Sequence, residues 1–252
     1  SVSPRGWASS SRTRSLASRG SWSPPSASGG GQAALDRAIK YAKGRRQFGA
    51  PLSEKQGFTH KLLVPHSVRL AAARAYIEYV SNLLDSGDTE RQVEGSISKL
   101  FATEECNLAA DHAVQALGGY GYCTEYEVEK IRRDARILTI YEGTSEIQQN
   151  IIGVFRLRQD VRSKGAFYGE MADSVAGLEH VGGDAVAPTV RFLSKCTKIA
   201  FKKKLTKQQH ALFELAWAMT ECGISVAGNR PPATSPRVTA GFRWQPEMWP
   251  MA

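Results

Sequence analysis

The sequence predicts an all-α protein, an up-and-down helical bundle with further helices toward its C-terminal end and disordered ends. Apolar residues recur three and four positions apart, as at Leu70, Ala73 and Ile77, which is the spacing of one helix face. The alternation of apolar and polar residues that is typical of β-strands does not occur over any length. Four Ser or Thr residues stand three positions before a Gln, which is the pattern of a helix start.

The composition excludes several classes of protein. The chain has 252 residues, 42% of them hydrophobic, which is enough for a sizeable core in one or two domains. No apolar run reaches the roughly 18–20 residues that span a bilayer, so we expect no membrane span. The four cysteines lack metal-ligand spacing and no two histidines stand four residues apart, so we expect reduced thiols and no metal site.

The net charge of +9 comes from the ends of the chain. Residues 31–190 carry 19 basic and 21 acidic side chains, whereas residues 1–30, 191–228 and 229–252 have net charges of +4, +5 and +2. The cations from Arg191 to Lys207 would suit nucleic acid or a membrane surface, but a solvated helix end is the simpler explanation. We therefore expect no nucleic-acid partner.

Both ends of the chain have the composition of disordered segments. Residues 1–30 contain eleven Ser, four Arg and no acidic residue, and they hold too few large apolar side chains to fold alone. The same composition is typical of an organelle transit peptide. A genuine transit peptide would place the protein in the mitochondrial matrix, and otherwise a cytoplasmic location is expected. Residues 229–252 are Pro-rich and predict a disordered tail.

The first half of the bundle contains two predicted helices. The first covers residues 33–43 and ends before Gly49-Ala50-Pro51. Ser53 and Gln56 form a capping box that opens the second helix, which continues to Ser86-Gly87. Pro65 lies inside this second helix and should kink it or split it in two.

The second half contains three more predicted elements. A capping box at Thr89 opens a long helix that ends at Leu117, before Gly118-Gly119. A short charged helix follows near residues 125–136. Ser145 and Gln148 form the next capping box, which opens a helix to about Arg158.

The chain divides into a bundle over residues 31–158 and a helical extension over residues 159–228. The extension contains two or three predicted helices, one of which opens at a capping box formed by Thr206 and Gln209.

Three segments could carry chemistry, and each also has a purely structural explanation. Arg45 and its neighbours close the first helix, where cations favour the helix dipole, but an Arg fork also suits phosphate. The glycine-rich segment 115–122 is not a G-x-G-x-x-G motif and follows no strand, so it is either a helix end or a place of close ligand approach. Glu142 follows an apolar run, and a carboxylate in apolar surroundings is a useful base near neutral pH, although a Glu near a helix start is favoured anyway.

In their order and spacing, these segments closely resemble the C-terminal helical domain of acyl-CoA dehydrogenases. The resemblance covers Gln32 to about Arg158. It rests on Ala34-Leu35-Asp36, on Tyr41-Ala42-x-x-Arg45-x-x-Phe48-Gly49, on Gln56, on Gln115-x-x-Gly118-Gly119-x-Gly121, on Thr124-Glu125-Tyr126-x-Val128-Glu129-Lys130, on Arg133-Asp134 and on Ile140 to Gln148. Residues 159–228 resemble, more weakly, the helical extension of some longer members.

The resemblance implies an FAD-dependent enzyme that dehydrogenates acyl-CoA thioesters between Cα and Cβ, with Glu142 as the base. It implies a homodimer or homotetramer with FAD shared across subunits, and an electron-accepting flavoprotein as partner of the complete enzyme. The implied cofactor-binding residues are Arg45, Phe48, Gln56, Gln115, Gly118, Gly119, Thr144 and Glu146. The residues implied to contact substrate are Tyr141 and Gly143.

The family also has an N-terminal helical domain and a middle β-domain, to which nothing in these 252 residues corresponds. The chain is therefore expected to match the C-terminal part of such an enzyme and to lack half of the flavin site. The alternative is a non-catalytic helical module that forms oligomers by pairing with a complete dehydrogenase subunit.

Overall fold

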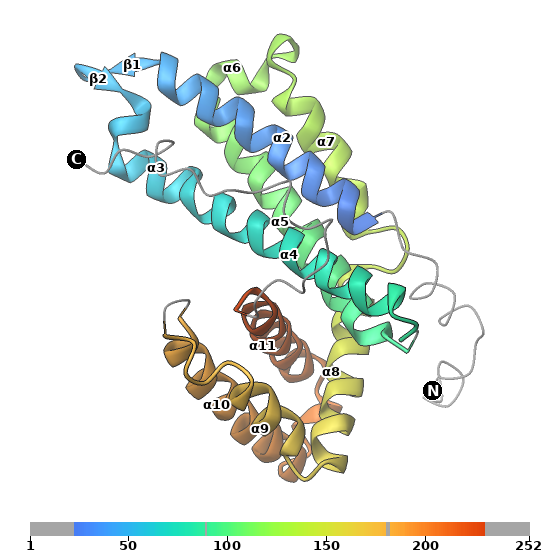
Figure 1. Ribbon diagram of the computed structural model, residues 1–252. Coiled ribbons are helices and arrows are strands. Elements are labelled where there is room, and N and C mark those ends of the chain that lie inside the picture. Colours follow the sequence, from blue (N-terminus) through green and yellow to red (C-terminus); the bar gives the residue numbers. More distant parts are fainter. Residues whose placement is uncertain (1–22, 89, 180–181, 230–252) are drawn as a thin grey trace.

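The computed structural model describes residues 23–88, 90–179 and 182–229, and the regular structure of this part is helical except for one short hairpin (Figure 1). The all-α prediction is confirmed. The α-helices are α2 (Ser23–Gly44), α3 (Gln56–Leu62), α4 (Val64–Asp85), α5 (Gln92–Leu117), α6 (Gly119–Tyr122), α7 (Val128–Arg136), α8 (Ser145–Arg162), α9 (Ala166–Asp173), α10 (Gly183–Lys202) and α11 (Gln209–Gly228). The hairpin pairs β1 (Arg46–Gln47) with β2 (Ala50–Pro51) in antiparallel register.

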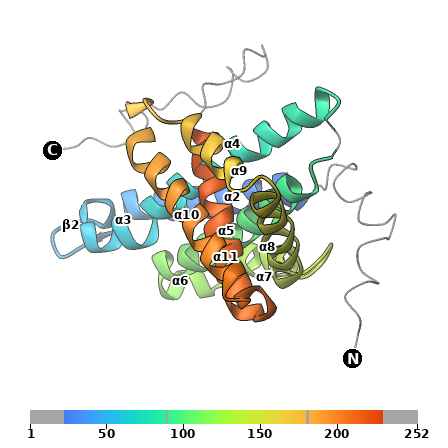
Figure 2. The same cartoon turned by 90° about the horizontal axis from the view of Figure 1, so that it is seen from below.

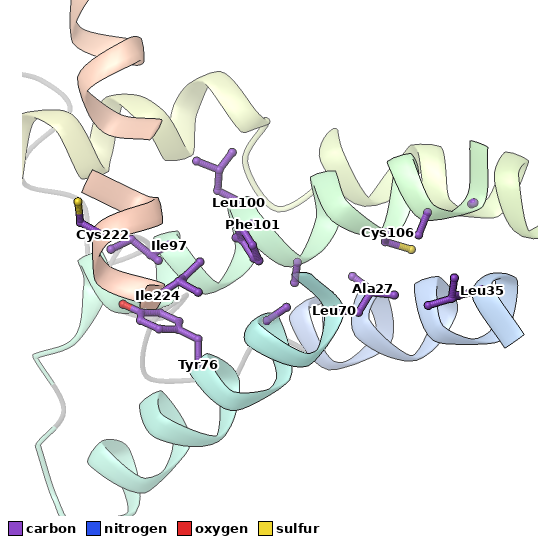
Figure 3. Packing of buried hydrophobic residues seen from close by; sticks show 14 of the residues in the cluster. Ala27, Leu35, Leu70, Tyr76, Ile97, Leu100, Phe101, Cys106, Cys222 and Ile224 are labelled. Carbon is purple, nitrogen blue, oxygen red and sulfur yellow. The ribbon is translucent and has the colours of Figure 1, made fainter. Parts of the chain in front are cut away.

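Helix α5 is the centre of the bundle. Helices α2, α4, α7 and α8 all pack against it, and its apolar residues are buried nearly all round (Figure 1). A helix that is enclosed on every side needs apolar residues on every side, unlike the one-sided helices at the surface. Figure 3 shows its Ile97 and Phe101 on the side of α4 and α11, Leu100 on the opposite side, and its Cys106 facing Ala27 of α2.

The first helix begins earlier than the sequence predicted. The predicted disordered leader covers residues 1–30, but α2 starts at Ser23 and buries Ala27, Ser28 and Gly31. These small residues let α2 approach α5 closely: a Cβ on Gly31 would lie 2.8 Å from Cδ2 of Leu70 and 3.2 Å from Cα of Cys106. The prediction is thus wrong for residues 23–30, and residues 1–22 lie outside the described part of the chain.

Pro65 splits the second predicted helix in two. Helix α3 ends at Leu62, and α4 starts at Val64 with Pro65 at its second position. The first N–H groups of a helix have no partner within the helix, so a proline there costs no hydrogen bond.

The three predicted capping boxes that lie within the described residues do not form. Ser53 lies inside a 3₁₀ turn (Leu52–Glu54), and the N-cap of α3 is Lys55, without a side-chain hydrogen bond. The N-caps of α8 and α11 are Thr144 and Gln208 in place of the predicted Ser145 and Thr206. For α8, the Ser145 hydroxyl bonds to the Glu104 carboxylate on α5 and is therefore not available as a cap. Thr89 lies outside the described residues.

The extension consists of three helices, α9, α10 and α11, within the predicted two or three. They lie together on one side of the bundle (Figures 1 and 2). Helix α8 runs without interruption across the predicted boundary at residue 158, and α11 packs on both α8 and α4. The predicted tail begins at Asn229, the last described residue, and residues 230–252 lie outside the described part. No described helix combines the length and hydropathy of a membrane span.

Candidate functional site

Four of the predicted cofactor-binding residues line one groove. Arg45, directly after α2, lines it together with Gln115 near the end of α5, Gly118 between α5 and α6, and Gly119 at the start of α6. The groove has a volume of about 510 Å³. Its other lining residues are Tyr41, Leu52, Ala116, Leu117, Tyr120 and Cys123.

The glycines keep this groove open. Gly118 ends α5 with a φ of 62°, a conformation that glycine adopts without strain. A Cβ added to Gly118 or Gly119 would meet no other atom within 4 Å, so a larger side chain would project into open space at the groove.

The groove has the chemistry of a nucleotide diphosphate site. The Arg45 guanidinium suits phosphate oxygens, and the Gln115 side chain adds an amide donor. Tyr41 and Tyr120 supply aromatic rings with centroids 6.2 Å apart in edge-to-face geometry. The residues present therefore fit the ADP half of a dinucleotide such as FAD.

Two other predicted cofactor residues lie outside the groove lining. Phe48 is at the tip of the hairpin with a φ of 50°, and it is 94% exposed. Its carbonyl accepts a hydrogen bond from Nζ of Lys55 at 3.2 Å, which ties the hairpin to the start of α3. Gln56 is the exposed first residue of α3. The predicted cofactor-binding residues of this region therefore lie in two places: four line the groove, and Phe48 and Gln56 lie at an exposed edge formed by the hairpin and the start of α3.

Glu142 lies at the other end of the bundle, in the turn that precedes α8. It has a φ of 53°, and Gly143 follows with a φ of 92°, so the chain makes two consecutive left-handed steps. The side chains of Glu142, Ile140 and Tyr141 are exposed in this chain. The apolar surroundings that the sequence left open for Glu142 are therefore not supplied by its neighbours Ile140 and Tyr141, which face outward.

Two buried side chains, which the sequence analysis missed, hold the turn from inside. Nζ of Lys99, on α5, donates a hydrogen bond to the Gly143 carbonyl at 2.8 Å. Nε2 of Gln148, on α8, donates to the carbonyls of Glu142 and Gly143 at 3.2 and 3.3 Å. The signal that could have pointed to Lys99 is its position among the apolar residues of the long α5 pattern, where a lysine needs a partner.

The two remaining cofactor candidates start α8 beside this turn. Thr144 is the N-cap, and Glu146 lies in the first helical turn. The pKa of Glu146 is lowered, mainly by a hydrogen bond from the Thr144 side chain and secondly by one from the backbone. Its negative charge is therefore stabilised at the positive end of the helix. Ser145 bonds to the Glu104 carboxylate on α5 instead of capping α8.

The groove and the Glu142 turn are separate in one chain. The groove lies at the C-terminal end of α5, whereas the turn contacts Lys99 in the N-terminal half of this helix. Lys99, under the turn, and Gln115, in the groove, are 16 residues apart on this helix, or about 24 Å at a rise of 1.5 Å per residue. Among the described residues, no group of His, Cys, Asp and Glu has the arrangement of a metal site.

The fold and the site together define a helical domain with a nucleotide-type groove at one end and a carboxylate turn at the other. The sequence profile of the acyl-CoA dehydrogenase C-terminal domain matches residues 24–155. The chain belongs to the acyl-CoA dehydrogenase family, which makes it a member of an oxidoreductase lineage. The match begins within α2 and agrees with the helical start observed at Ser23.

Curated relatives match the same half of the chain. A subunit of the caffeyl-CoA reductase–Etf complex of Acetobacterium woodii is 41% identical over 128 residues, which is 51% of this chain and 33% of the relative. The mitochondrial short-chain specific acyl-CoA dehydrogenase of Sus scrofa is 44% identical over 121 residues, which is 48% of this chain and 29% of the relative. The chain thus spans about a third of the length of the curated relatives it matches.

Solved structures share the fold. A glutaryl-coenzyme A dehydrogenase in complex with glutaryl-CoA superposes with a TM-score of 0.55 at 32% identity, over 58% of this chain and 37% of the other. An acyl-CoA dehydrogenase from Bacillus anthracis, complexed with FAD, gives a TM-score of 0.63 over 80% of this chain and 38% of the other. At 22% identity this second likeness shows the fold alone, but its coverage indicates that helices beyond the bundle are shared as well.

Proposed function

We propose that the chain supplies the base and part of the flavin site of an FAD-dependent enzyme that dehydrogenates acyl-CoA thioesters between Cα and Cβ. The observation that carries the proposal is the Glu142 turn. Its two carbonyls are bonded inward to Lys99 and Gln148, while the Glu142 carboxylate is exposed. The sequence around it, from Ile140 to Gln148, is one of the segments that resemble the family.

Glu142 accepts the α-proton of the thioester in this mechanism. The electron pair of the Cα–H bond becomes the new double bond, while the hydrogen on Cβ leaves with its own electron pair. FAD, when bound, supplies the acceptor for that hydride. Tyr141 and Gly143, on either side of the base, contact the substrate, and the fixed turn keeps the carboxylate directed at Cα.

The FAD site takes residues from two subunits. Arg45, Gln115, Gly118 and Gly119 hold the ADP half in the groove of one subunit, with Phe48 and Gln56 at its exposed edge. Thr144 and Glu146 contact the flavin beside Glu142 of another subunit. The separation of about 24 Å along α5 supports a homodimer or homotetramer, because one chain cannot present both ends to one short stretch of cofactor.

An electron-accepting flavoprotein is the proposed partner for reoxidation, and its support is the name of the Acetobacterium woodii relative, a subunit of a reductase–Etf complex.

The test is anaerobic reduction of bound FAD by acyl-CoA. The purified protein is loaded with FAD, and bleaching of the visible flavin absorbance is followed after addition of butyryl-CoA and longer acyl-CoA. Glu142→Gln should retain FAD and lose bleaching by about 10²- to 10⁴-fold, the usual contribution of a positioned base. Equal bleaching rates in the two proteins would disprove the role of Glu142.

The second candidate function is a non-catalytic module that pairs with a complete dehydrogenase subunit. Its support is that the chain spans about a third of its curated relatives. Co-expression with a complete dehydrogenase separates the two candidates. A mixed oligomer that forms equally well with Glu142→Gln, together with no flavin bleaching by the chain itself, favours the module.

A further inference from the structure

We propose that Lys99 is a positioning residue for the Glu142 base, because its buried amine fixes the Glu142–Gly143 turn from within the bundle. The proposal rests on the function proposed above, in which Glu142 accepts the α-proton. No part of the resemblance assigned a role to Lys99, which lies 43 residues before Glu142 in the sequence.

Lys99 is buried in the middle of the bundle. It is only 3% exposed and stands on α5 between Ile97 and Leu100, which are fully enclosed. Burial lowers the pKa of its amine, while the carboxylates of Glu104, Glu142 and Glu146 oppose that shift. A buried amine is costly unless it is bonded, and the Gly143 carbonyl at 2.8 Å is the partner that the fold provides.

The turn needs support from outside itself. A non-glycine residue at positive φ, such as Glu142 at 53°, is strained and persists only where its surroundings hold it. Lys99 and Gln148 bond the two turn carbonyls from different helices, α5 and α8. The Gln148 bonds are longer, at 3.2 and 3.3 Å, so Lys99 makes the shortest of these contacts.

The inward bonds of the carbonyls decide where the carboxylate points. With both carbonyls facing the bundle, the Glu142 side chain is on the exposed side of the turn. Without the Lys99 bond, the Gly143 carbonyl keeps only the longer bond from Gln148, so the peptide between Gly143 and Thr144 is held less firmly and the carboxylate loses part of its fixed direction. Misplacement of a catalytic group by about 1 Å can cost roughly 10²-fold in rate.

The test compares Lys99→Met with a matched control, Thr103→Ala. Methionine has similar volume without charge, and an apolar replacement of a buried charged group is often tolerated by the fold. Thr103 is fully buried one turn further along α5, where its hydroxyl bonds to the Lys99 backbone carbonyl at 2.8 Å. The control therefore perturbs the same helix without touching the turn. If Lys99→Met does not fold, Lys99→Gln takes its place.

Two measurements decide the role. In the chain without FAD, amide hydrogen exchange over residues 142–148 should become about tenfold faster in Lys99→Met, as expected for the loss of one charge-assisted hydrogen bond. In the FAD-loaded protein, kcat should fall by about 10²-fold while KM stays nearly constant. Thr103→Ala should lower the Tm without either effect.

Three outcomes would overturn the proposal. Unchanged exchange and unchanged kcat in Lys99→Met would show that the turn holds without Lys99. A raised KM at constant kcat would assign Lys99 to substrate binding. An active Glu142→Gln variant would disprove the proposed base and the positioning role with it, whereas an inactive Glu142→Gln beside a fully active Lys99→Met would disprove only the role of Lys99.

Discussion

Three glycines within four residues serve different physical purposes at the end of α5. Gly118 provides the positive φ that ends the helix, and Gly119 leaves the groove open. Gly121 is instead a packing residue, because a Cβ there would lie 2.3 Å from the Val114 carbonyl oxygen on α5. Glycines that look equivalent in the sequence therefore have different tolerance to substitution.

Gly121→Ala should destabilise the protein by about 1–3 kcal/mol, the usual cost of forced overpacking against backbone that cannot move freely. Gly119→Ala is the control, because its added methyl group meets no atom within 4 Å, and its free energy of unfolding should change by less than about 0.5 kcal/mol. Urea denaturation of the two variants measures the difference. Equal midpoints would show that α6 can move away from α5.

Buried polar contacts between helices fix how the elements pack. Arg156 of α8 bonds to Glu94 of α5 at 2.9 Å and lies over the Phe167 ring of α9, 4.9 Å from its centroid. Both side chains of the ion pair are largely buried. Desolvation lowers the pKa of Arg156, but Coulomb attraction to Glu94 and the other interactions outweigh it and leave the pKa raised. This one side chain therefore joins three helices.

Arg156→Met should cost about 3 kcal/mol, since removal of one partner of a buried pair leaves the other charge poorly compensated. Arg91, which lies 3.6 Å from Glu94, limits the loss. Arg133→Met provides the control, because Arg133 makes an exposed ion pair with Glu129 and its loss should leave the thermal midpoint unchanged. Equal thermal midpoints for both variants would contradict the structural role of Arg156.

A second buried contact makes the packing of α4 on α5 sensitive to pH. Nε2 of His66 and Nδ1 of His112 are 2.5 Å apart, and Nδ1 of His66 is 2.5 Å from the Glu105 carboxylate. In the His66–His112 contact one ring nitrogen donates and the other accepts the hydrogen bond. Burial, and then the nearby His66, lower the pKa of His112; Asp111 and Glu105 raise it, and Lys61 lowers it.

The protein should therefore lose stability as the pH falls from about 7 to 5. A histidine with a pKa below its ordinary value of 6.5 binds fewer protons when folded, so its contribution to stability is present above that value and is lost as the pH falls toward the folded pKa. Thermal midpoints measured across this range should fall less steeply in His112→Gln. Parallel curves for the two proteins would exclude His112 as the source.

For the whole molecule, the separation of groove and turn has a consequence for mixed oligomers. Arg45→Ala impairs the groove and Glu142→Gln impairs the turn, and under the proposed function each should be inactive alone. A site that takes its groove from one subunit and its turn from another is intact in about a quarter of random pairings. Mixed oligomers, co-expressed or refolded together, should regain about that share of flavin bleaching. No recovery would show that both ends serve a site within one subunit.

Much of the fold could be predicted from the sequence, and less of the site. The helical periodicity identified the helices and the split at Pro65, because burial of one face imposes its spacing on the chain. The capping box at Ser145 was wrong because Ser145 bonds to Glu104 of α5 and Gln148 bonds to the turn before α8. The leader boundary was wrong because the small residues of Ser23–Gly31 read as low complexity, whereas they are what lets two helices approach closely.

By itself, the sequence determined the helical class, the family and the identity of the candidate base, since periodicity and motif spacing are local properties of the chain. Only the tertiary structure decided which of those residues meet. It joined Arg45 to Gln115 across 70 positions, separated both from Glu142 and brought Lys99 beneath the Glu142 turn. The physical reason is that contacts between distant segments depend on how the helices pack. The hydrogen-bond partner of a buried amine such as Lys99 is therefore set by the tertiary structure and not by the neighbouring sequence.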